Sequence, residues 1–512
     1  MQEFDGVQLG LFSHRLAAVC DEMGAILRRA AFSPNIKDRL DFSCAIFDPH
    51  GQLCAQAAHI PVHLGSMAYA MADIVGAVDW RDGDMLVVND PYMGGTHLPD
   101  VTMIMPVFAE GQLQAFVVNR AHHANIGADT PGSMPISSRL QEEGLIIEPS
   151  LVLRDGEFQQ PLWQQLLDLT EDGSGGDFIA QISANQAGAR RLQGLIAHGD
   201  FLAQLAALQD YGERLARAAF AELPQGGYYF ADEMDDDGQG QQRIRIALHL
   251  SIKHQQIHAD FTGTAAQVAG NINCPISVAA AAVYYVFRCL LPAYAPNCAG
   301  IFRPVSIHAP KGCLVNASWP HAVAAGNVET STRIVDVVLG ALAEAMPERI
   351  PAASYGSMNN VAMGAKASAV GPGWSYYETI GGGAGAHAGA DGQSGVQCHM
   401  TNTLNTPVES LEMHYPLRLR RYQLRQGSGG DGRHAGGDGI VREYELLQPA
   451  TVTLLTERRL LQPWGLQGGS AGLPGNNLVN GRVMPGKCEL QLRSGDILRI
   501  ETPGGGGWGR SD

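Results

Sequence analysis

The chain has 512 residues, of which 45% are hydrophobic and 17% are charged. That length exceeds what one hydrophobic core usually fills, so the composition predicts a globular protein built from two or more closely packed portions and excludes a disordered chain. With 51 acidic and 35 basic residues the net charge is −16. This charge repels phosphate backbones and anionic lipid surfaces, so neither a nucleic acid nor a membrane is expected as a partner.

The first residues, MQEFDGVQLG, contain no basic region followed by an apolar core, so no secretory signal is expected. The longest apolar run, residues 278–287, is far shorter than the roughly 20 residues that span a bilayer. We therefore expect a cytoplasmic protein. Its nine cysteines occur singly, without a C-x-x-C pair, which favours buried thiols over disulfides or a zinc ribbon.

In the first half of the chain, apolar residues recur every three or four positions over residues 8–31, which predicts an amphipathic helix. The segments FSCAIFD, PHGQ and LCAQAA then predict a β-hairpin with Gly51 in its turn. Two further apolar runs, MLVVND and LQAFVVNRAHH, predict strands that end in polar side chains. Such strand ends are where a functional site is expected.

Residues 173–223 keep a helical period, which predicts long helices, and residues 224–227 mark a candidate boundary. Alternating apolar residues over 228–264 predict a β-meander, and helices are expected at 276–291 and 333–345. Beyond residue 350, glycine-rich segments separate short strands. The predicted fold is α+β, with portions 1–223 and 224–512 packed closely, long helices between β-rich parts, and a glycine-rich, β-rich C-terminal half. The acidic run Asp235–Asp237 is expected to be an exposed hairpin tip.

The stretch NDPYMGGTHLPDVT, together with its neighbours, provides a candidate metal site. Carboxylates and imidazoles occur at Asp41, His97, Asp100 and the adjacent pair His122 and His123. These groups fall at predicted strand ends or on a glycine bend, and they are the donors that a divalent cation of borderline hardness prefers. The alternative is a turn stabilised by an aspartate and a hydrogen-bonded histidine. Because neighbours on a strand face opposite sides, only one histidine of the pair need be a ligand.

Weaker candidates lie outside this group. His59 and His63 flank Pro61, which favours extended structure and leaves both a structural role and a substrate-side role open. Asn402 and Glu409 belong to CHMTNTLNTPVE, whose polar groups can bind substrate or form turns. The glycine-rich motifs open no helical pattern, so no nucleotide site is expected in this chain.

Long ordered motifs give the sequence a family resemblance. NIKDRLDFSCAIFDPHGQLCAQAAHIPVHLGSM, NDPYMGGTHLPDVTMIMPVF, NRAHHANIG and MTNTLNTPVESLEMHYPLR closely resemble the hydantoinase B family, as do GSGGDGRHAGGDGIVRE and ETPGGGGWG near the C-terminus. The family includes the C-terminal half of 5-oxoprolinase and large subunits of ATP-dependent acetone and acetophenone carboxylases. The resemblance covers essentially the whole chain.

This resemblance implies a two-component enzyme. A hydantoinase A-like ATP-binding subunit phosphorylates a substrate carbonyl oxygen, and the B component acts on the activated species with a divalent metal, zinc or manganese. Asp41, His97, Asp100 and His122 or His123 stand where relatives have Asp, H-x-x-D and His-His, with Asp41 and the pair also expected in catalysis. His59, His63, Asn402 and Glu409 are expected to orient substrate. In HHANIGAD, however, Asn125 replaces an acid that many relatives carry.

The expected function is therefore the metal-bearing subunit of an ATP-dependent hydrolase of lactams or cyclic imides, with ATP bound by its partner. A hetero-oligomer such as (αβ)2 is expected, because low charge and apolar glycine-rich segments suit large interfaces. Two alternatives stay open: the large subunit of an ATP-dependent ketone carboxylase, and a non-catalytic scaffold.

Overall fold

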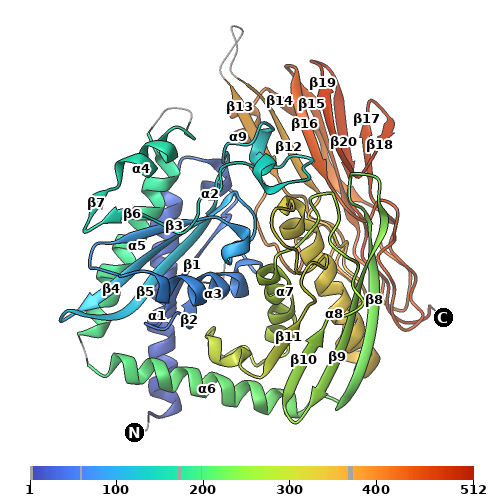
Figure 1. The fold of residues 1–512 in the computed structure, drawn as a ribbon. Helices are drawn as coiled ribbons and strands as arrows, with labels where there is room; N and C mark the ends of the chain where they lie inside the picture. The colour runs from blue at the N-terminus through green and yellow to red at the C-terminus, as the bar shows by residue number, and fades with distance from the viewer. Residues whose placement is uncertain (1–3, 58–59, 171–173, 198, 367–372, 512) are drawn as a thin grey trace.

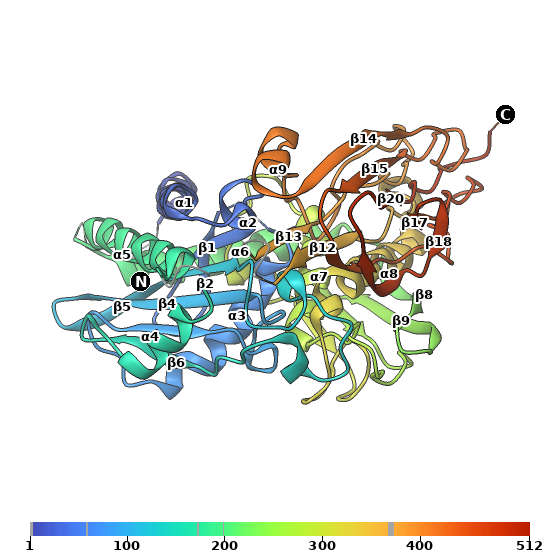
Figure 2. The same cartoon turned by 90° about the horizontal axis from the view of Figure 1, so that it is seen from above.

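The computed structural model describes residues 4–57, 60–170, 174–197, 199–366 and 373–511. Over these residues the protein is α+β, and its strands form four sheets. Figures 1 and 2 show an N-terminal sheet with its helices on one side of the molecule and the later sheets on the other, with α7 and α8 between them. The expected fold class is confirmed.

The N-terminal sheet has the strand order β2-β1-β5-β4-β3-β6-β7. Helices α1 and α5 cover one face and α3 covers the other, so both faces are buried. In β1, Cys44 and Ile46 face the first layer while Ala45 and Phe47 face the second. The bounds are α1 Gly6–Ala30, α2 Pro34–Lys37, β1 Phe42–Phe47, β2 Leu53–Gln56, α3 His63–Ile74, β3 Met85–Val88, β4 Asp100–Ala109, β5 Gln112–His122, β6 Ser150–Arg154, β7 Glu157–Phe158 and α5 Gly176–Ile196.

The predicted first helix and hairpin are confirmed by α1 and by the antiparallel pair β1 and β2, with Gly51 at a φ of 77° in the turn. The long helices expected over 173–223 are α5 and α6 (Phe201–Ala221), preceded by α4 (Gln160–Leu167). None of the described helices combines the length and the apolar character that crossing a bilayer requires.

A second sheet begins where the long helices end, and its order is β11-β10-β9-β8. Its strands are β8 Gly226–Asp236, β9 Gln242–Lys253, β10 Gln256–Asp260 and β11 Val305–His308, which confirms the expected meander. Helices α7 (Ile276–Cys289) and α8 (Ser331–Ala345) confirm the two helices expected here, and α8 follows a π-helical turn, Gly326–Thr330.

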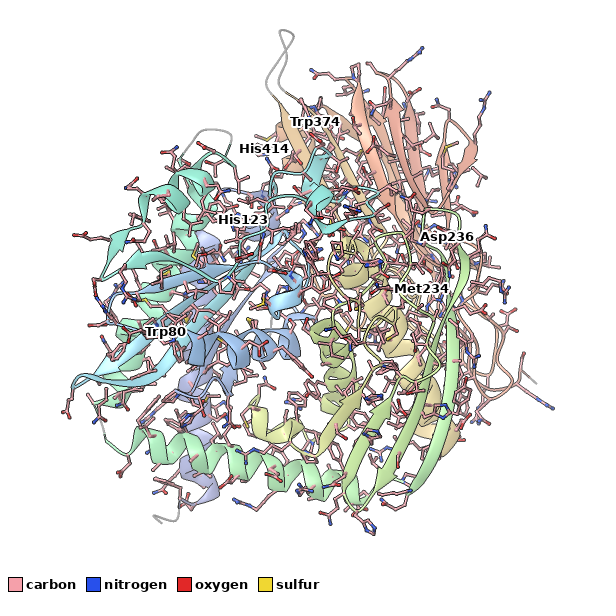
Figure 3. All side chains as sticks on the ribbon, viewed as in Figure 1. Trp80, His123, Met234, Asp236, Trp374 and His414 are labelled. Atoms are coloured by element: carbon pink, nitrogen blue, oxygen red, sulfur yellow. The ribbon has the colours of Figure 1, made fainter. Side chains whose placement is uncertain are left out.

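The prediction that Asp235–Asp237 is an exposed tip is wrong. Asp235 is buried and accepts hydrogen bonds from the backbone N–H groups of Arg459, Leu460 and Leu461. Asp237 is also buried and accepts from the N–H groups of Gln239 and Gln241. Figure 3 shows the neighbouring Asp236 beside the glycine-rich chain beyond residue 350, which is called the C-terminal portion from here on. The run therefore connects β8 to the C-terminal portion through hydrogen bonds. A run of acidic residues in the sequence does not reveal such a contact.

The C-terminal portion consists of two sheets, ordered β13-β12-β16-β19 and β14-β15-β20-β17-β18, with a common apolar core. The elements are β12 Asn360–Ala365, β13 Trp374–Glu378, α9 Val408–His414, β14 Leu417–Arg425, β15 Gly439–Leu446, β16 Ala450–Leu455, β17 Asn476–Val479, β18 Arg482–Met484, β19 Lys487–Leu492 and β20 Ile497–Glu501. The expected β-rich half is confirmed.

Glycine-rich segments of this portion pack backbone against backbone. A Cβ at Gly383 would lie 1.8 Å from the carbonyl oxygen of Gly437. The N–H of Gly505 donates to that same oxygen at 2.9 Å, and the N–H of Gly430 donates to the oxygen of Gly505 at 2.9 Å. Glycine is therefore required at such positions by close approach of neighbouring chains as well as by turns.

The nine cysteines are all free thiols. Six are buried, as expected from their isolated positions, two are half-buried, and Cys289 is exposed. Burial raises the pKa of Cys20, Cys44, Cys54 and Cys274, which keeps these thiols protonated and unreactive.

Candidate metal centre

Two adjacent strands and a bend bring the candidate ligands together. Asp100 begins β4 and His122 ends β5, and the two residues are paired directly across the sheet. Asp41 immediately precedes β1, and its carbonyl oxygen accepts a hydrogen bond from the N–H of His122 at 3.0 Å. The start of β4, the end of β5 and the residue before β1 therefore meet at one end of these neighbouring strands.

The bend before β4 depends on Gly94. Its φ is 88°, and a Cβ at this position would lie 2.2 Å from the backbone nitrogen of Ala70 in α3. Glycine is needed both for the left-handed backbone and for the close approach to the helix. The bend returns the chain so that the N–H of Asp100 donates to the carbonyl oxygen of His97 at 3.1 Å.

His97, Asp100 and His122 form a compact group of possible metal ligands. One donor atom of each lies within 4.8 Å of the donor atoms of the other two. His97 Nε2, Asp100 Oδ1 and His122 Nε2 are all buried and meet no hydrogen-bond criterion among the described residues, although His97 Nε2 lies 3.4 Å from Asp100 Oδ2 within the group. Leaving several buried polar atoms unpaired is costly, and a cation among them would satisfy all three. The donor set, two imidazoles and a carboxylate, suits zinc or manganese.

The three ligand atoms face a small buried cavity of about 20 Å³, which is enough for a water-sized group. Polar and apolar side chains share its walls. The lining residues are Asp41, Ile60, Val62, His63, His97, Asp100, His122, Asn327, Val328, Met358, Tyr377, Thr379, Met400, Thr401 and Thr403. These residues come from the N-terminal sheet and its connections, the turn before α8 and the C-terminal portion, so segments from both halves of the chain build the centre.

A hydrogen bond fixes the ring of His97. Its Nδ1 donates to the carbonyl oxygen of Ala324 at 3.2 Å, which leaves Nε2 directed at the group. The backbone at this position is itself held by Glu143, whose Oε1 accepts from the N–H groups of Val323 and Ala324, each at 2.9 Å. Glu143 is buried, and burial raises its pKa to about 7.

Two side chains orient His122. Its ring is stacked on Tyr377, with centroids 4.8 Å apart and an angle of 1° between the planes. The Nδ2 of Asn35 lies 3.2 Å from His122 Nδ1. If a cation binds His122 Nε2, the proton of the neutral ring is on Nδ1. The Asn35 amide would then be turned by 180°, so that its Oδ1 accepts a hydrogen bond from Nδ1.

The charges of the group are strongly coupled. Burial alone would raise the pKa of Asp100, but His97 and His63 hold it well below its usual range. Burial opposes protonation of His97, yet the charge of Asp100 raises the pKa of this histidine overall. Burial and the charge of His97 push the pKa of His122 well below its usual value. His122 is therefore a neutral imidazole, the form that binds metals.

Asp41 lines the cavity but stands outside the compact group. Its Oδ2 lies 3.8 Å from the guanidinium of Arg39, which is fully buried. Burial raises the pKa of Asp41 although Arg39 opposes this rise. Arg39 also donates to the carbonyl oxygen of Tyr377 at 3.1 Å and to Thr379 Oγ1 at 3.2 Å.

His63 lies closer to the group than the sequence indicated. The expectation of extended structure around Pro61 is wrong at His63, because α3 begins at this residue and Pro61 lies just before the helix, where proline is tolerated. His63 Nε2 lies 3.3 Å from Asp100 Oδ2, and its Nδ1 lies 2.9 Å from Ser43 Oγ. The helix therefore delivers this imidazole to the cavity wall.

His123 is directed away from the group. Its Nε2 lies 2.8 Å from Gln181 Oε1 of α5, and its ring stacks on Phe178 with centroids 4.2 Å apart. Figure 3 shows His123 in the interior between the N-terminal sheet and its neighbours. As expected for adjacent residues at a strand end, only His122 joins the cluster.

Of the remaining substrate-side candidates, the two that the structure describes do not line the cavity. His59 lies outside the described residues. Asn402 and Glu409 are exposed, and neither lines the cavity, although Thr401 and Thr403 next to Asn402 do. Alternate residues of this extended segment thus face the cavity and the surface.

Comparison with known proteins decides the family. Residues 5–511 match the family described as Hydantoinase B/oxoprolinase. The chain belongs to this family.

Three relatives of this Hydantoinase B/oxoprolinase chain are informative. It is 40% identical to 5-oxoprolinase 1 of Arabidopsis thaliana over 99% of its own length but spans only 42% of that protein. The crystal structure of ATP-dependent caprolactamase from Pseudomonas jessenii superimposes with a TM-score of 0.92 and 27% identity, covering 99% of this chain and 92% of that one. The nucleotide-free acetone carboxylase structure gives a TM-score of 0.87 at 16% identity, covering 99% and 76% of the two chains. The last likeness concerns the fold alone.

Residue reasoning missed several side chains that build this centre. Asn35, Arg39, Glu143 and Tyr377 are buried polar residues from three separate segments, and each contacts a candidate ligand or the backbone that binds one. A buried Asn or Glu in a turn looks like a turn former in sequence. Only the pairing of distant segments identifies these residues as supports of the centre.

Proposed function

We propose that this chain is the metal-bearing component of an ATP-dependent cyclic amide hydrolase. Its substrate class would be a lactam or cyclic imide, such as 5-oxoproline or a hydantoin, whose carbonyl oxygen is first phosphorylated by a partner. The observation that carries the proposal is the convergence of three buried potential ligand atoms, of His97, Asp100 and His122, within 4.8 Å of one another on one cavity. The names of the hydrolytic relatives support the same reaction class.

His97, Asp100 and His122 would hold the cation, which we propose to be zinc or manganese, with Asp41 beside it. When bound, such a cation supplies Lewis-acid chemistry and makes a water molecule more acidic. The chain's own residues prepare for it: neutral His122 offers a lone pair, and the hydrogen bond to Ala324 keeps Nε2 of His97 free.

The residues that line the cavity offer groups for the second half of such a reaction. An amide carbonyl resists water because of resonance, and phosphorylation of its oxygen turns that oxygen into a leaving group. Asp41 can accept a proton from the attacking water at its carboxylate, because burial raises the pKa of that group. The hydroxyls of Thr379, Thr401 and Thr403 can orient the polar edge of a ring.

ATP would be used by the partner rather than by this chain. We propose a hydantoinase A-like ATP-binding chain, assembled with this one as a hetero-oligomer such as (αβ)2. The chain spans 42% of 5-oxoprolinase 1, so the ATP-using part proposed here lies outside the residues of this chain.

The test combines the purified chain with its candidate partner, ATP and a panel of lactams and cyclic imides. We expect ring opening that depends on ATP and on one bound metal per chain, and loss of both metal and turnover in His97→Ala. Carboxylation of a ketone in bicarbonate, without ring opening, would replace the hydrolase by a carboxylase. If the wild-type chain binds no metal and contributes to neither reaction, a scaffold role is favoured.

A further inference from the structure

The edge strand β14 has an unusual surface for a chain of this charge. The consecutive residues Arg420–Leu424 are all exposed. Among the described residues, no other strand pairs with the outer edge of β14. Tyr422 is 48% exposed and Leu424 46%, so large apolar groups face solvent. The N–H of Leu419 donates to Glu412 Oε1 of α9 at 2.9 Å, so the edge that is open for strand addition lies beyond this residue, over Arg420–Leu424.

Neighbouring residues extend this surface. Leu404, which is 52% exposed, and Met413 of α9, which is 79% exposed, flank the strand. We call Leu404, Met413, Arg420, Arg421, Tyr422 and Leu424 the β14 surface. Figure 2 shows α9 and β14 together along one side of the molecule. Its combination of Tyr, Met and Arg is the composition that is enriched at the centres of protein interfaces.

Tyr422 is held rigidly although it is exposed. Its hydroxyl donates to Asn405 Oδ1 at 2.9 Å, and the guanidinium of the buried Arg442 lies 4.8 Å from its ring centroid. An aromatic side chain fixed in this way loses little conformational entropy on binding. Tyr422 is thus a pre-organised anchor.

Charge indicates what would cover the surface. The chain carries a net charge of −16, yet β14 alone contributes Arg418, Arg420, Arg421 and Arg425 and no acid. Arg418 and Arg420 share the single carboxylate of Glu445. A segment that pairs with β14 would need acidic residues toward the arginines and apolar residues toward Tyr422 and Leu424.

The β14 surface also adjoins the segment that lines the candidate metal centre. The N–H of Leu404 donates to the carbonyl oxygen of Arg39 at 3.0 Å, and Thr401 and Thr403 of the same segment line the cavity. The proposed phosphorylated substrate must reach the residues of this wall without first being hydrolysed in bulk water. A partner docked on the β14 surface would lie against this wall.

We propose that the β14 surface docks an extended, acid-bearing segment of the ATP-using partner chain, which adds a strand to the edge of β14. The inference rests on the proposed function for the identity of the partner. It is independent of the reaction that the assembled enzyme performs.

The experiment measures the dissociation constant between the purified full chain and its candidate ATP-using partner. Tyr422→Ala and the pair Arg420→Glu with Arg421→Glu should each weaken binding by about 30-fold or more, as expected for a central anchor and for charge reversal. The matched control is Val483→Asp in β18, at the opposite edge of the same sheet and 70% exposed. It should bind as wild type, and all variants should keep their bound metal.

Unchanged binding in both β14 variants would overturn the proposal. It would also be overturned if the wild-type chain and the partner opened lactam rings together but formed no complex. Loss of a dimer of this chain alone in Tyr422→Ala would also overturn it, because the occupant would then be a second copy. A wild-type complex that the variants weaken but that hydrolyses no lactam would support the docking surface while refuting the proposed function.

Discussion

At the scale of single residues, the centre is defined by polar atoms that the fold buries without partners. Proteins normally pair their buried polar groups, so three potential ligand atoms without a regular hydrogen bond around one cavity support the proposed metal site. The adjacent histidines illustrate the distinction, because Nε2 of His122 is unpaired whereas Nε2 of His123 lies at hydrogen-bond distance from Gln181.

Replacing either histidine of this pair should separate the two roles. His122→Ala should weaken metal binding by more than about 100-fold, because it removes a ligand. His123→Ala should keep the metal but lower the free energy of unfolding by about 2 kcal/mol, since it removes a buried hydrogen bond and a ring contact. Metal analysis and denaturant unfolding measure these effects, and the reverse pattern would exclude His122 as the ligand.

Glu143 should act on the metal through His97 without touching it. Glu143→Ala should lower metal affinity by roughly 10- to 100-fold, because the backbone that accepts the hydrogen bond of His97 loses its support. Glu143→Gln should stay near wild type, since its amide oxygen can still accept from Val323 and Ala324. Titration with zinc of the chain alone provides the readout, and equal loss in both variants would contradict this positioning role.

At the scale of elements, glycine segments and helix starts position the site. α3 begins at His63 and thereby places this imidazole against Asp100. In the C-terminal portion, glycines let neighbouring segments exchange backbone hydrogen bonds at distances that a side chain would block. These contacts hold the portion that supplies Tyr377, Thr401 and Thr403 to the cavity.

Gly383→Ala should therefore be severely destabilising. The added Cβ would collide with the carbonyl oxygen of Gly437, so we expect a loss of more than about 4 kcal/mol or failure to fold. Gly194→Ala in α5 is the matched control, because no atom lies within 4 Å of its Cβ position. It should leave stability unchanged or raise it by about 0.5–1 kcal/mol. Thermal unfolding compares the two variants.

At the scale of the whole molecule, Glu329 joins the middle of the chain to the C-terminal portion. It lies in the π-helical turn before α8, and its Oε1 accepts from the N–H of Met358 at 3.0 Å and from Asn360 Nδ2 at 2.7 Å. Asn360 in turn accepts from the hydroxyl of Tyr377, whose ring stacks on His122. The candidate metal centre is thereby connected to the packing of both halves.

Stability should fall as pH rises across the range set by Glu329. Burial raises its pKa from 4.5 to about 8 in the folded state. Between these values the folded chain binds a proton that the unfolded chain has lost, so the free energy of unfolding decreases with pH by up to about 1.4 kcal/mol per unit. Unfolding at several pH values should show a smaller slope for Glu329→Gln, and an identical slope would contradict this assignment.

The sequence by itself determined the fold class, the first helix, the hairpin and the later helices, because each depends on local periodicity and turn residues. It also supplied the family motifs and the residues of the candidate centre, since metal ligands are limited to a few residue types.

Only the tertiary structure decided which groups meet. It separated His122 from His123, brought His63 to Asp100, placed Asn402 and Glu409 on the surface, and buried the acidic run Asp235–Asp237. It also showed the supporting roles of Asn35, Glu143 and Tyr377. These outcomes depend on contacts between segments that are tens to hundreds of residues apart, where burial and pairing, rather than local pattern, determine the environment of each side chain.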